Sequence, residues 1–309
     1  MNLSLPELAE QYLDMKQTLG YRCTGIAPTL RSFVRFAEQR KDTLIRSETV
    51  FTWLNASTKA SAFTQVNKLR VVRKFAISLR LSDPRHELPP DCLGQARHHR
   101  PTPFVLSLQD IDKVLAQALQ LPPANTITPL TWHYFFGLIA ATGLRVSEAL
   151  ELTFDDLTAN TLIIRNGKFG KTRMIVLHRS VIKAIDQYLQ VRHKMPTTSR
   201  HLFVLASGKP PGRNYPSVIF RKLCEQVGLR QTGAPRGPTP HSLRHAFAIR
   251  SLEHLNHDAD ISRHMLALAT YLGHCKVSNT YWYLEVTQTL LQSISQATEQ
   301  HQTNHRRRP

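Results

Sequence analysis

The sequence lacks any apolar run that approaches the roughly 20 residues a membrane-spanning helix needs. It also lacks the basic segment that opens a signal peptide, because its first residues, MNLSLPELAEQ, carry acids instead. Its 4 cysteines are far apart and form no CxxC pair, which argues against a zinc ribbon or a disulfide framework. These absences predict a cytoplasmic protein with reduced thiols and no membrane partner.

Acidic residues are few beside the basic ones: 22 Asp and Glu stand against 40 Lys and Arg, a formal net charge of +18. Such an excess is typical of proteins that bind a polyanion, here DNA, RNA or an anionic membrane surface. The missing apolar spans make the membrane the weakest of these candidates. With 309 residues, the chain is long enough for about two domains.

The first 100 residues predict a small, basic, all-helical domain. Apolar residues recur at helical spacing over about 4–41, with breaks at Gly20 and Gly25, and again over 47–56 and 59–79. The last helix carries a group of basic side chains, which are Lys68, Arg70, Arg73 and Lys74. Any one of them could be a plain solvated charge, so the prediction that they bind DNA depends on their number.

Proline, glycine and charged residues crowd together between about 83 and 103, which is typical of an extended linker. The linker is basic and includes Arg100, so we also expect it to lie along a DNA backbone. We place the domain boundary here. The predicted divisions are a helical DNA-binding domain over 1–100, a second domain over 101–300 and a basic tail over 301–309.

The second domain is predicted to be mainly α with one small β-hairpin. Two β-branched runs, 161–165 and 172–177, flank a glycine-containing turn and predict the hairpin. Ser107 is the expected N-cap of the first helix, and Gly143 is expected to end a strongly apolar helix. Helical spacing predicts the other helices over 132–141, 146–152, 180–193, 217–227, 241–255, 261–272, 277–285 and 287–300.

Three stretches of this domain carry residues suited to a phosphate. They are 142–148 (TGLRVSE), 240–247 (PHSLRHAF) and 272–274 (LGH), the last followed nine residues later by Tyr283. His241 and Arg244 are three residues apart, so they share one face of a helix. A guanidinium fork and an imidazole near a helix start can both bind phosphate oxygens.

In this order, and with a lysine in the hairpin, the motifs resemble those of the tyrosine recombinase (phage integrase) family, in its Xer-like bacterial branch. The resemblance covers about residues 1–295; each motif alone is weak, whereas the ordered set is specific. It implies a helical, SAM-like core-binding domain followed by a tyrosine recombinase catalytic domain. Carried over by motif, the active residues are Arg145, Lys168, His241, Arg244, His274 and Tyr283, with Glu148 and Lys171 in support.

The resemblance also implies the chemistry. Tyr283 would attack the scissile phosphate and form a 3′-phosphotyrosyl bond, which leaves a free 5′-hydroxyl and needs no cofactor or ATP. Arg145 and Arg244 would hold the non-bridging oxygens and stabilise the transition state. His241 would assist proton transfer at the tyrosine hydroxyl or donate to the phosphate, and His274 would donate to the phosphate or support the tyrosine.

Several residue assignments have competitors. Tyr281 competes with Tyr283 as the nucleophile, and Lys171 competes with Lys168 as the acid for the departing 5′-oxygen. Structural roles are the alternative throughout: salt bridges for the arginines, a surface acid for Glu148, helix caps for the histidines and core packing for the tyrosines. His241 and His245 also have the spacing of a zinc pair, but the sequence offers no HExxH glutamate and no evident third ligand.

The predicted function is site-specific recombination of double-stranded DNA by a homotetramer that joins two duplexes, alone or with a second recombinase. The basic tail and the first domain slightly favour integration, excision or transposition of a mobile element. Chromosome or plasmid dimer resolution is the alternative role. The alternative activities are supercoil relaxation by a type IB topoisomerase, DNA binding without catalysis, and a zinc-dependent nuclease.

Overall fold

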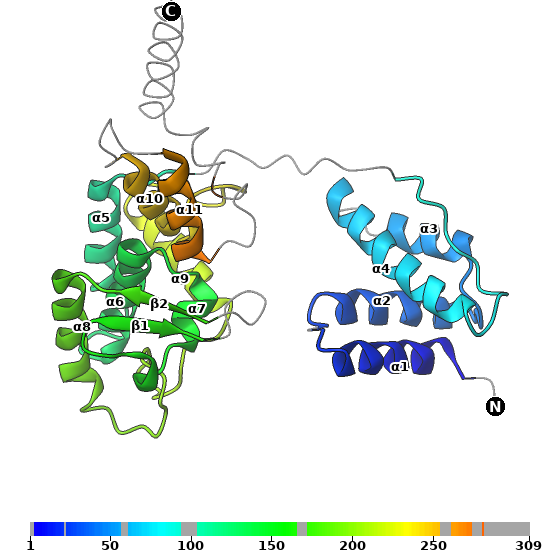
Figure 1. Ribbon diagram of the computed structural model, residues 1–309, viewed down its shortest axis with the longest axis horizontal. Coiled ribbons are helices and arrows are strands. Elements are labelled where there is room, and N and C mark those ends of the chain that lie inside the picture. Colours follow the sequence, from blue (N-terminus) through cyan, green and yellow to red (C-terminus); the bar gives the residue numbers. More distant parts are fainter. Residues whose placement is uncertain are drawn as a thin grey trace, which may run out of the picture. The chain divides into compact units, whose positions relative to one another are not determined.

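A computed structural model describes residues 3–21, 23–56, 61–93, 104–165, 172–253, 261–273 and 280. The chain divides into two compact units, Met1–Pro101 and Thr102–Pro309 (Figure 1). The described residues form helices and one two-stranded antiparallel sheet. The predicted fold class, mainly α with a small hairpin and two domains, is confirmed.

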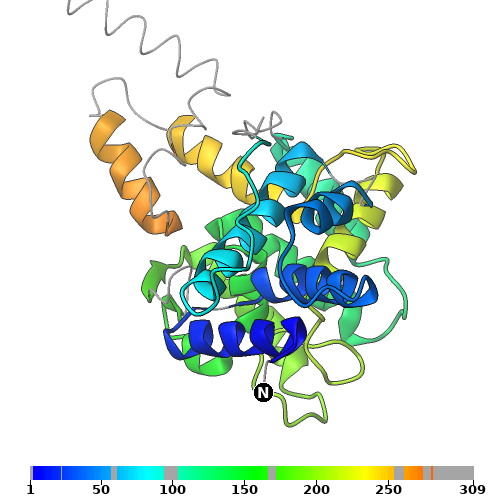
Figure 2. The same cartoon turned by 90° about the vertical axis from the view of Figure 1, so that its right-hand side faces the viewer.

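The described part of the first unit is all-helical. Its helices are α1 (Leu5–Thr18), α2 (Ile26–Gln39), α3 (Ser47–Ala56) and α4 (Ala62–Arg80). α1 and α2 lie side by side, and α4 contacts all three other helices (Figures 1 and 2). Their apolar faces form one core, in which Phe33, Trp53 and Phe75 are buried. The unit therefore has a hydrophobic core of its own.

The second unit is organised around a buried helix, α6. Its elements are α5 (Leu108–Ala118), α6 (Ile127–Thr142), α7 (Val146–Glu151), the 3₁₀ turn η1 (Phe154–Asp156), β1 (Thr161–Ile164), β2 (Arg173–Val176), α8 (Arg179–Arg192), α9 (Tyr215–Gln226), α10 (Pro240–Glu253) and α11 (Ile261–Leu272). α6 contacts α5, α7, α8 and α10. Most of its residues are buried, which explains why it is apolar on every face.

α6 begins five residues earlier than predicted. The hydroxyl of Thr126 caps it by accepting the backbone N–H of Thr128 at 3.3 Å. Pro129 lies in its first turn, where a missing N–H costs no helical hydrogen bond. The predicted start at Trp132 was wrong because the apolar spacing alone does not reveal this cap.

The hairpin pairs β1 with β2 so that Ile164 lies opposite Arg173. Alternation along a strand puts Ile164 and Ile175 in the core, while Met174 and Val176 are exposed. Arg173 falls on the same inward face as Ile175. A charged side chain on the inward face of a strand needs a partner of opposite charge.

α11 packs against α10 through one apolar cluster (Figure 1). Its fully buried members are Ala248 and Leu252 of α10 and Met265 and Leu272 of α11. Because α10 also lies against α6, this cluster holds the C-terminal end of α11 near the end of α6. The expected helices over 277–285 and 287–300 fall outside the described residues apart from Thr280, as does the tail over 301–309.

Candidate active site

Three arginines from distant parts of the chain meet at the C-terminal end of α11. Each donates a hydrogen bond to one of three successive carbonyl groups. The pairs are Arg173 Nε to Tyr271 O (2.9 Å), Arg244 Nη2 to Leu272 O (2.7 Å) and Arg145 Nη2 to Gly273 O (2.7 Å). Carbonyls at a helix C-terminus lack intrahelical partners and carry partial negative charge, which favours cations there. The guanidinium groups of this arginine cluster therefore occupy one region.

Gly143 directs the chain from α6 into this cluster. It ends α6 in the left-handed conformation, with φ of 63°, and Arg145 follows as the N-cap of α7. The carbonyl of Gly143 accepts a hydrogen bond from Arg244 Nη1 at 2.5 Å. A Cβ at this position would lie 2.5 Å from Cδ1 of Phe247. Only glycine fits both the backbone conformation and the space.

Glu148 links two arginines of the cluster. Its Oε1 accepts from Arg145 Nη1 at 2.6 Å and from Arg173 Nη1 at 2.9 Å. Its Oε2 accepts from the Arg145 backbone N–H at 2.9 Å and from Arg173 Nη2 at 2.8 Å. Burial raises the pKa of this carboxyl, but the hydrogen bonds from Arg173 and Arg145 outweigh it and lower the pKa to about 2. Glu148 is therefore an anion with all its acceptor sites engaged.

Arg145 keeps donor capacity for a ligand. Glu148 and Gly273 each take one of the five N–H groups of its guanidinium. The remaining N–H groups make no hydrogen bond to the described part of the chain, and 21% of the side-chain surface is exposed. Arg244, in contrast, is buried, with 1% exposed.

His241 is the second residue of α10, at the edge of the cluster, and it is exposed to solvent. Desolvation by surrounding protein atoms, together with the positive charges of Arg244 and Arg145, lowers the pKa of His241 to about 4. The imidazole is therefore neutral at pH 7, with one nitrogen as donor and the other as acceptor. The ring of His245 stands edge-on to it, with 4.3 Å between centroids.

Arg173 is the member of the cluster that sequence reasoning missed. Its signal was present: strand alternation places this arginine on the inward face of the hairpin, between Ile175 and the turn. No spacing rule, however, connects position 173 with Glu148, because that contact is made only by the folded chain.

Four of the predicted DNA-binding residues, Lys68, Arg70, Arg73 and Lys74, lie on α4. Arg70 and Lys74 are exposed and separated by one helical turn, whereas Arg73 is half-buried. The ammonium of Lys68 lies 5.2 Å from the ring centroid of Trp53. The predicted residues outside the described ranges are Arg100, Lys168, Lys171, His274 and Tyr283.

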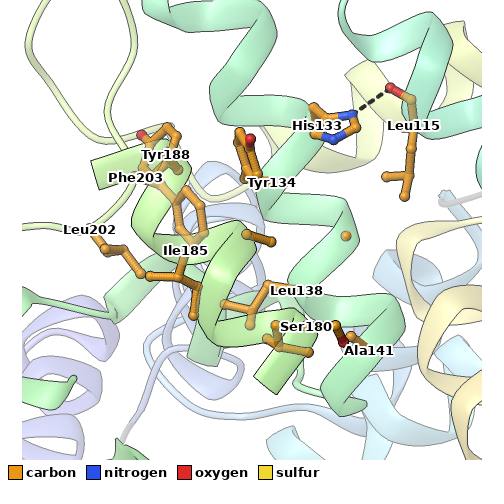
Figure 3. Close-up of a pocket in the computed structure, with 13 residues that line it drawn as sticks. Leu115, His133, Tyr134, Leu138, Ala141, Ser180, Ile185, Tyr188, Leu202 and Phe203 are labelled. Atoms are coloured by element: carbon orange, nitrogen blue, oxygen red, sulfur yellow. Dashed lines mark hydrogen bonds between the residues drawn. The ribbon is translucent and has the colours of Figure 1, made fainter. Parts of the chain in front are cut away.

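A separate cavity of about 230 Å³ lies between α5, α6 and α8 (Figure 3). Its walls are mostly apolar, with Leu138, Ile185 and Phe203 among them. Nδ1 of His133 donates to the carbonyl of Leu115 at 2.9 Å on one side. The arginine cluster does not line this cavity, so the two features are distinct.

The described ranges contain neither a metal-ligating cluster nor a membrane-spanning helix. No group of three or more His, Cys, Asp or Glu side chains there is arranged to ligate a metal ion. No helix there is both long and apolar enough to cross a bilayer.

Comparison with known sequences identifies the family. Residues 109–289 match the phage integrase family. The chain is 31% identical over 302 residues to the putative integrase/recombinase y4rB of Sinorhizobium fredii, covering 95% of this chain and 96% of that one. It is 28% identical over 238 residues to the tyrosine recombinase XerD of Brucella abortus, covering 75% and 74% of the two chains.

Solved structures share the fold. The XerH site-specific recombinase bound to a palindromic difH substrate, a post-cleavage complex, has a TM-score of 0.64 at 20% identity and covers 89% of this chain and 79% of its own. The Tn1549 transposon integrase in complex with transposon right end DNA has a TM-score of 0.66 at 17% identity, covering 95% and 98%. With the family match, these likenesses lead to one conclusion: this chain is a DNA-binding, tyrosine-type site-specific recombinase of the phage integrase family.

Proposed function

We propose that the chain cuts and rejoins DNA through a 3′-phosphotyrosyl bond between Tyr283 and the scissile phosphate. The observation that carries the proposal is the meeting of Arg145, Arg244 and a neutral His241 at the end of α11. In the sequence, His274 follows that end directly and Tyr283 comes nine residues later. Two cations and a proton acceptor therefore lie at the end of α11, the helix that precedes the proposed nucleophile in the sequence.

In the proposed step, the phenol oxygen of Tyr283 forms a bond to phosphorus while the bond to the 5′-oxygen breaks. The neutral imidazole of His241 can take the phenol proton, and Lys168 gives a proton to the departing oxygen, with Lys171 as its rival. The N–H groups that Arg145 does not use within the described chain are suited to the non-bridging oxygens. Rejoining reverses these transfers, so the bond energy is conserved without ATP.

Arg244 fits this scheme with one added requirement. Its guanidinium is buried and donates to the carbonyls of Gly143 and Leu272. Direct contact with a phosphate would therefore require the surrounding chain to rearrange. In the structure, Arg244 supports the backbone that positions Arg145.

We also propose the biological setting. The Tn1549 structure contains transposon DNA, and y4rB is described as an integrase/recombinase, which supports integration, excision or transposition of a mobile element. The XerH complex contains a difH substrate, and the chain also resembles XerD tyrosine recombinases. Chromosome or plasmid dimer resolution stays the alternative role. Four copies would join two duplexes in the cytoplasm, alone or with a second recombinase.

The nucleophile is tested with a nicked duplex that carries a site selected by the protein from a randomised DNA library. Wild-type protein should form a covalent adduct that survives denaturing electrophoresis. Tyr283→Phe should bind the duplex but form no adduct, because it lacks the phenol oxygen. Tyr281→Phe is the matched control and should keep the adduct; loss of the adduct in this variant alone would reassign the nucleophile to Tyr281. Relaxation of a plasmid without the site would favour the topoisomerase alternative.

The phosphate clamp is tested with Arg145→Ala on the same duplex. Losing one preorganised cation should raise the barrier to cleavage by about 2–4 kcal/mol, which is roughly a 30- to 1,000-fold slower single-turnover rate. Arg165→Ala, on the same hairpin as Arg173 but paired with Asp156, is the control. A cleavage rate for Arg145→Ala equal to that of the control would remove the support for a clamp.

A further inference from the structure

We propose that Arg173 is a positioning residue for DNA cleavage, which sets where Arg145 presents its N–H groups to the phosphate. The inference rests on the proposed function and adds a residue to it. Arg173 acts through two contacts, the carboxylate of Glu148 and the carbonyl of Tyr271.

The first contact determines the orientation of Glu148. Arg173 binds the carboxylate in a bidentate manner, with Nη1 donating to Oε1 at 2.9 Å and Nη2 donating to Oε2 at 2.8 Å. The side chain of Arg145, in contrast, touches this carboxylate through Nη1 alone. The Arg145 backbone N–H also donates to Oε2, at 2.9 Å, so Arg173 supplies two of the four hydrogen bonds that hold this carboxylate. The direction of the Arg145 guanidinium therefore depends on Arg173 as well as on its own backbone.

The second contact determines where α11 ends. Arg173 Nε holds the carbonyl of Tyr271, and Arg145 Nη2 holds the carbonyl of Gly273. Gly273 lies beneath both guanidinium groups, because a Cβ there would lie 3.1 Å from Nη1 of Arg173 and 3.4 Å from Nη1 of Arg145. A shift of one arginine would thus move the carbonyl that the other one uses.

The charge balance explains why this position holds an arginine. Two guanidinium groups this close repel each other, and the buried carboxylate of Glu148 between them compensates. Only 14% of the Arg173 side chain is exposed, so solvent can replace few of its hydrogen bonds. Lysine would keep the charge, but its ammonium cannot span both carboxylate oxygens and reach Tyr271 as well.

The test compares Arg173→Lys with Arg165→Lys in the full-length protein. Arg165 directly follows β1 of the same hairpin and forms a more exposed ion pair, with 2.6 Å between its Nε and Oδ1 of Asp156 and 57% of its side chain exposed. Within the described part of the chain, no hydrogen bond joins it to Arg145. The measurements are single-turnover cleavage of the nicked duplex at saturating protein, duplex affinity and thermal stability. Arg173→Lys should cleave about 10- to 100-fold more slowly, because a small misplacement of a catalytic group is enough. Its duplex affinity should stay within about threefold of wild type.

A double-mutant cycle separates positioning from a general loss of structure. If Arg173 acts through Arg145, Arg173→Lys should slow an Arg145→Lys protein by no more than about twofold. The inference would be overturned if the rate losses of Arg173→Lys and Arg145→Lys multiplied in the double variant. It would also be overturned if Arg173→Lys and Arg165→Lys cleaved the duplex at equal rates. Should Arg173→Lys not fold, Glu148→Asp tests the same link, because it keeps the charge but withdraws the carboxylate; wild-type cleavage by that variant would equally overturn it. A wild-type protein without any adduct would instead contradict the proposed function.

Discussion

Glu148 carries the charge balance of the site. Three guanidinium groups gather at the end of α11 against this one buried carboxylate. The cluster thus keeps a net positive charge that a phosphate can neutralise, while Arg145 and Arg173 are held together by the carboxylate that they share. The lowered pKa of Glu148 keeps this balance unchanged across the physiological range.

The pH dependence of stability follows from that lowered pKa. The folded protein holds the pKa of Glu148 at about 2, below the ordinary value of 4.5, so the unfolded chain takes up a proton first as the pH falls. The contribution of the carboxylate is full above pH 4.5 and is lost as the pH falls towards 2. Glu148→Gln should therefore lower the free energy of unfolding by about 3 kcal/mol at neutral pH, and by progressively less as the pH falls from 4.5 towards 2.

Urea unfolding of Glu148→Gln and wild type at a series of pH values measures this difference. His241 is present in both proteins, so its own titration cancels. Asp110→Asn is the control, because that carboxylate caps α5 at the exposed surface away from the arginines. A Glu148→Gln deficit that stays constant from neutral to acidic pH would show that the carboxylate is not the titrating group.

At the scale of elements, the glycine that ends α6 is required by the fold, whereas the glycine within α6 is only tolerated. Gly143 ends the helix in the left-handed conformation and leaves no room for a Cβ. Gly137 lies within the helix, where a Cβ would meet only Leu115, at an ordinary contact distance of 3.8 Å. A change from glycine to alanine should therefore stabilise the protein at position 137 and destabilise it at position 143.

Gly137→Ala should raise the free energy of unfolding by about 0.5–1 kcal/mol, because alanine loses less backbone entropy in a helix. Gly143→Ala should lower it by more than about 1–2 kcal/mol, the cost of the left-handed conformation alone, since the contact with Phe247 adds to it. It should also slow cleavage, because the Gly143 carbonyl is held by Arg244. Urea unfolding measures both; destabilisation by Gly137→Ala would mean that the neighbouring cavity does not admit the methyl group.

At the scale of the whole molecule, the formal charge of +18 makes binding to DNA sensitive to salt. Some of this charge is already paired within the protein: Arg31, for example, holds Glu10 with two hydrogen bonds. Arg70 and Lys74 on α4 are exposed, and the structure gives neither an acidic partner among the described residues. These two are therefore the better candidates for phosphate contacts.

Arg70→Gln and Lys74→Gln should each reduce the slope of log affinity against log salt concentration by about 1, the effect of losing one phosphate contact. Arg31→Gln removes the same formal charge and should leave the slope nearly unchanged. Binding of a labelled duplex at several salt concentrations gives the slopes. Equal reductions in all three variants would show that net charge, rather than a face of α4, determines binding.

The sequence by itself was sufficient for the fold class, for the helix signals at Ser107 and Gly143, and for the ordered set of motifs. These depend on residues close together in the chain: the Ser107 cap, the Gly143 stop and the Arg145–Glu148 spacing can each be recognised within a few residues. The family assignment follows from the order of such local signals. Local chemistry is enough here because each signal needs only its own turn of helix.

Only the tertiary structure decided how the motifs combine. Arg173 and Glu148 are 25 positions apart, and Arg145 and Gly273 are 128 apart, so no local pattern connects them. The lowered pKa of His241 comes first from desolvation by the folded chain, then from the charges of Arg244 and of Arg145, which belongs to a different segment. Long-range electrostatics and buried hydrogen bonds exist only after distant segments pack. For this reason the sequence pointed to Arg145, Arg244 and Glu148, whereas the fold added Arg173 and the carbonyls that hold the arginines.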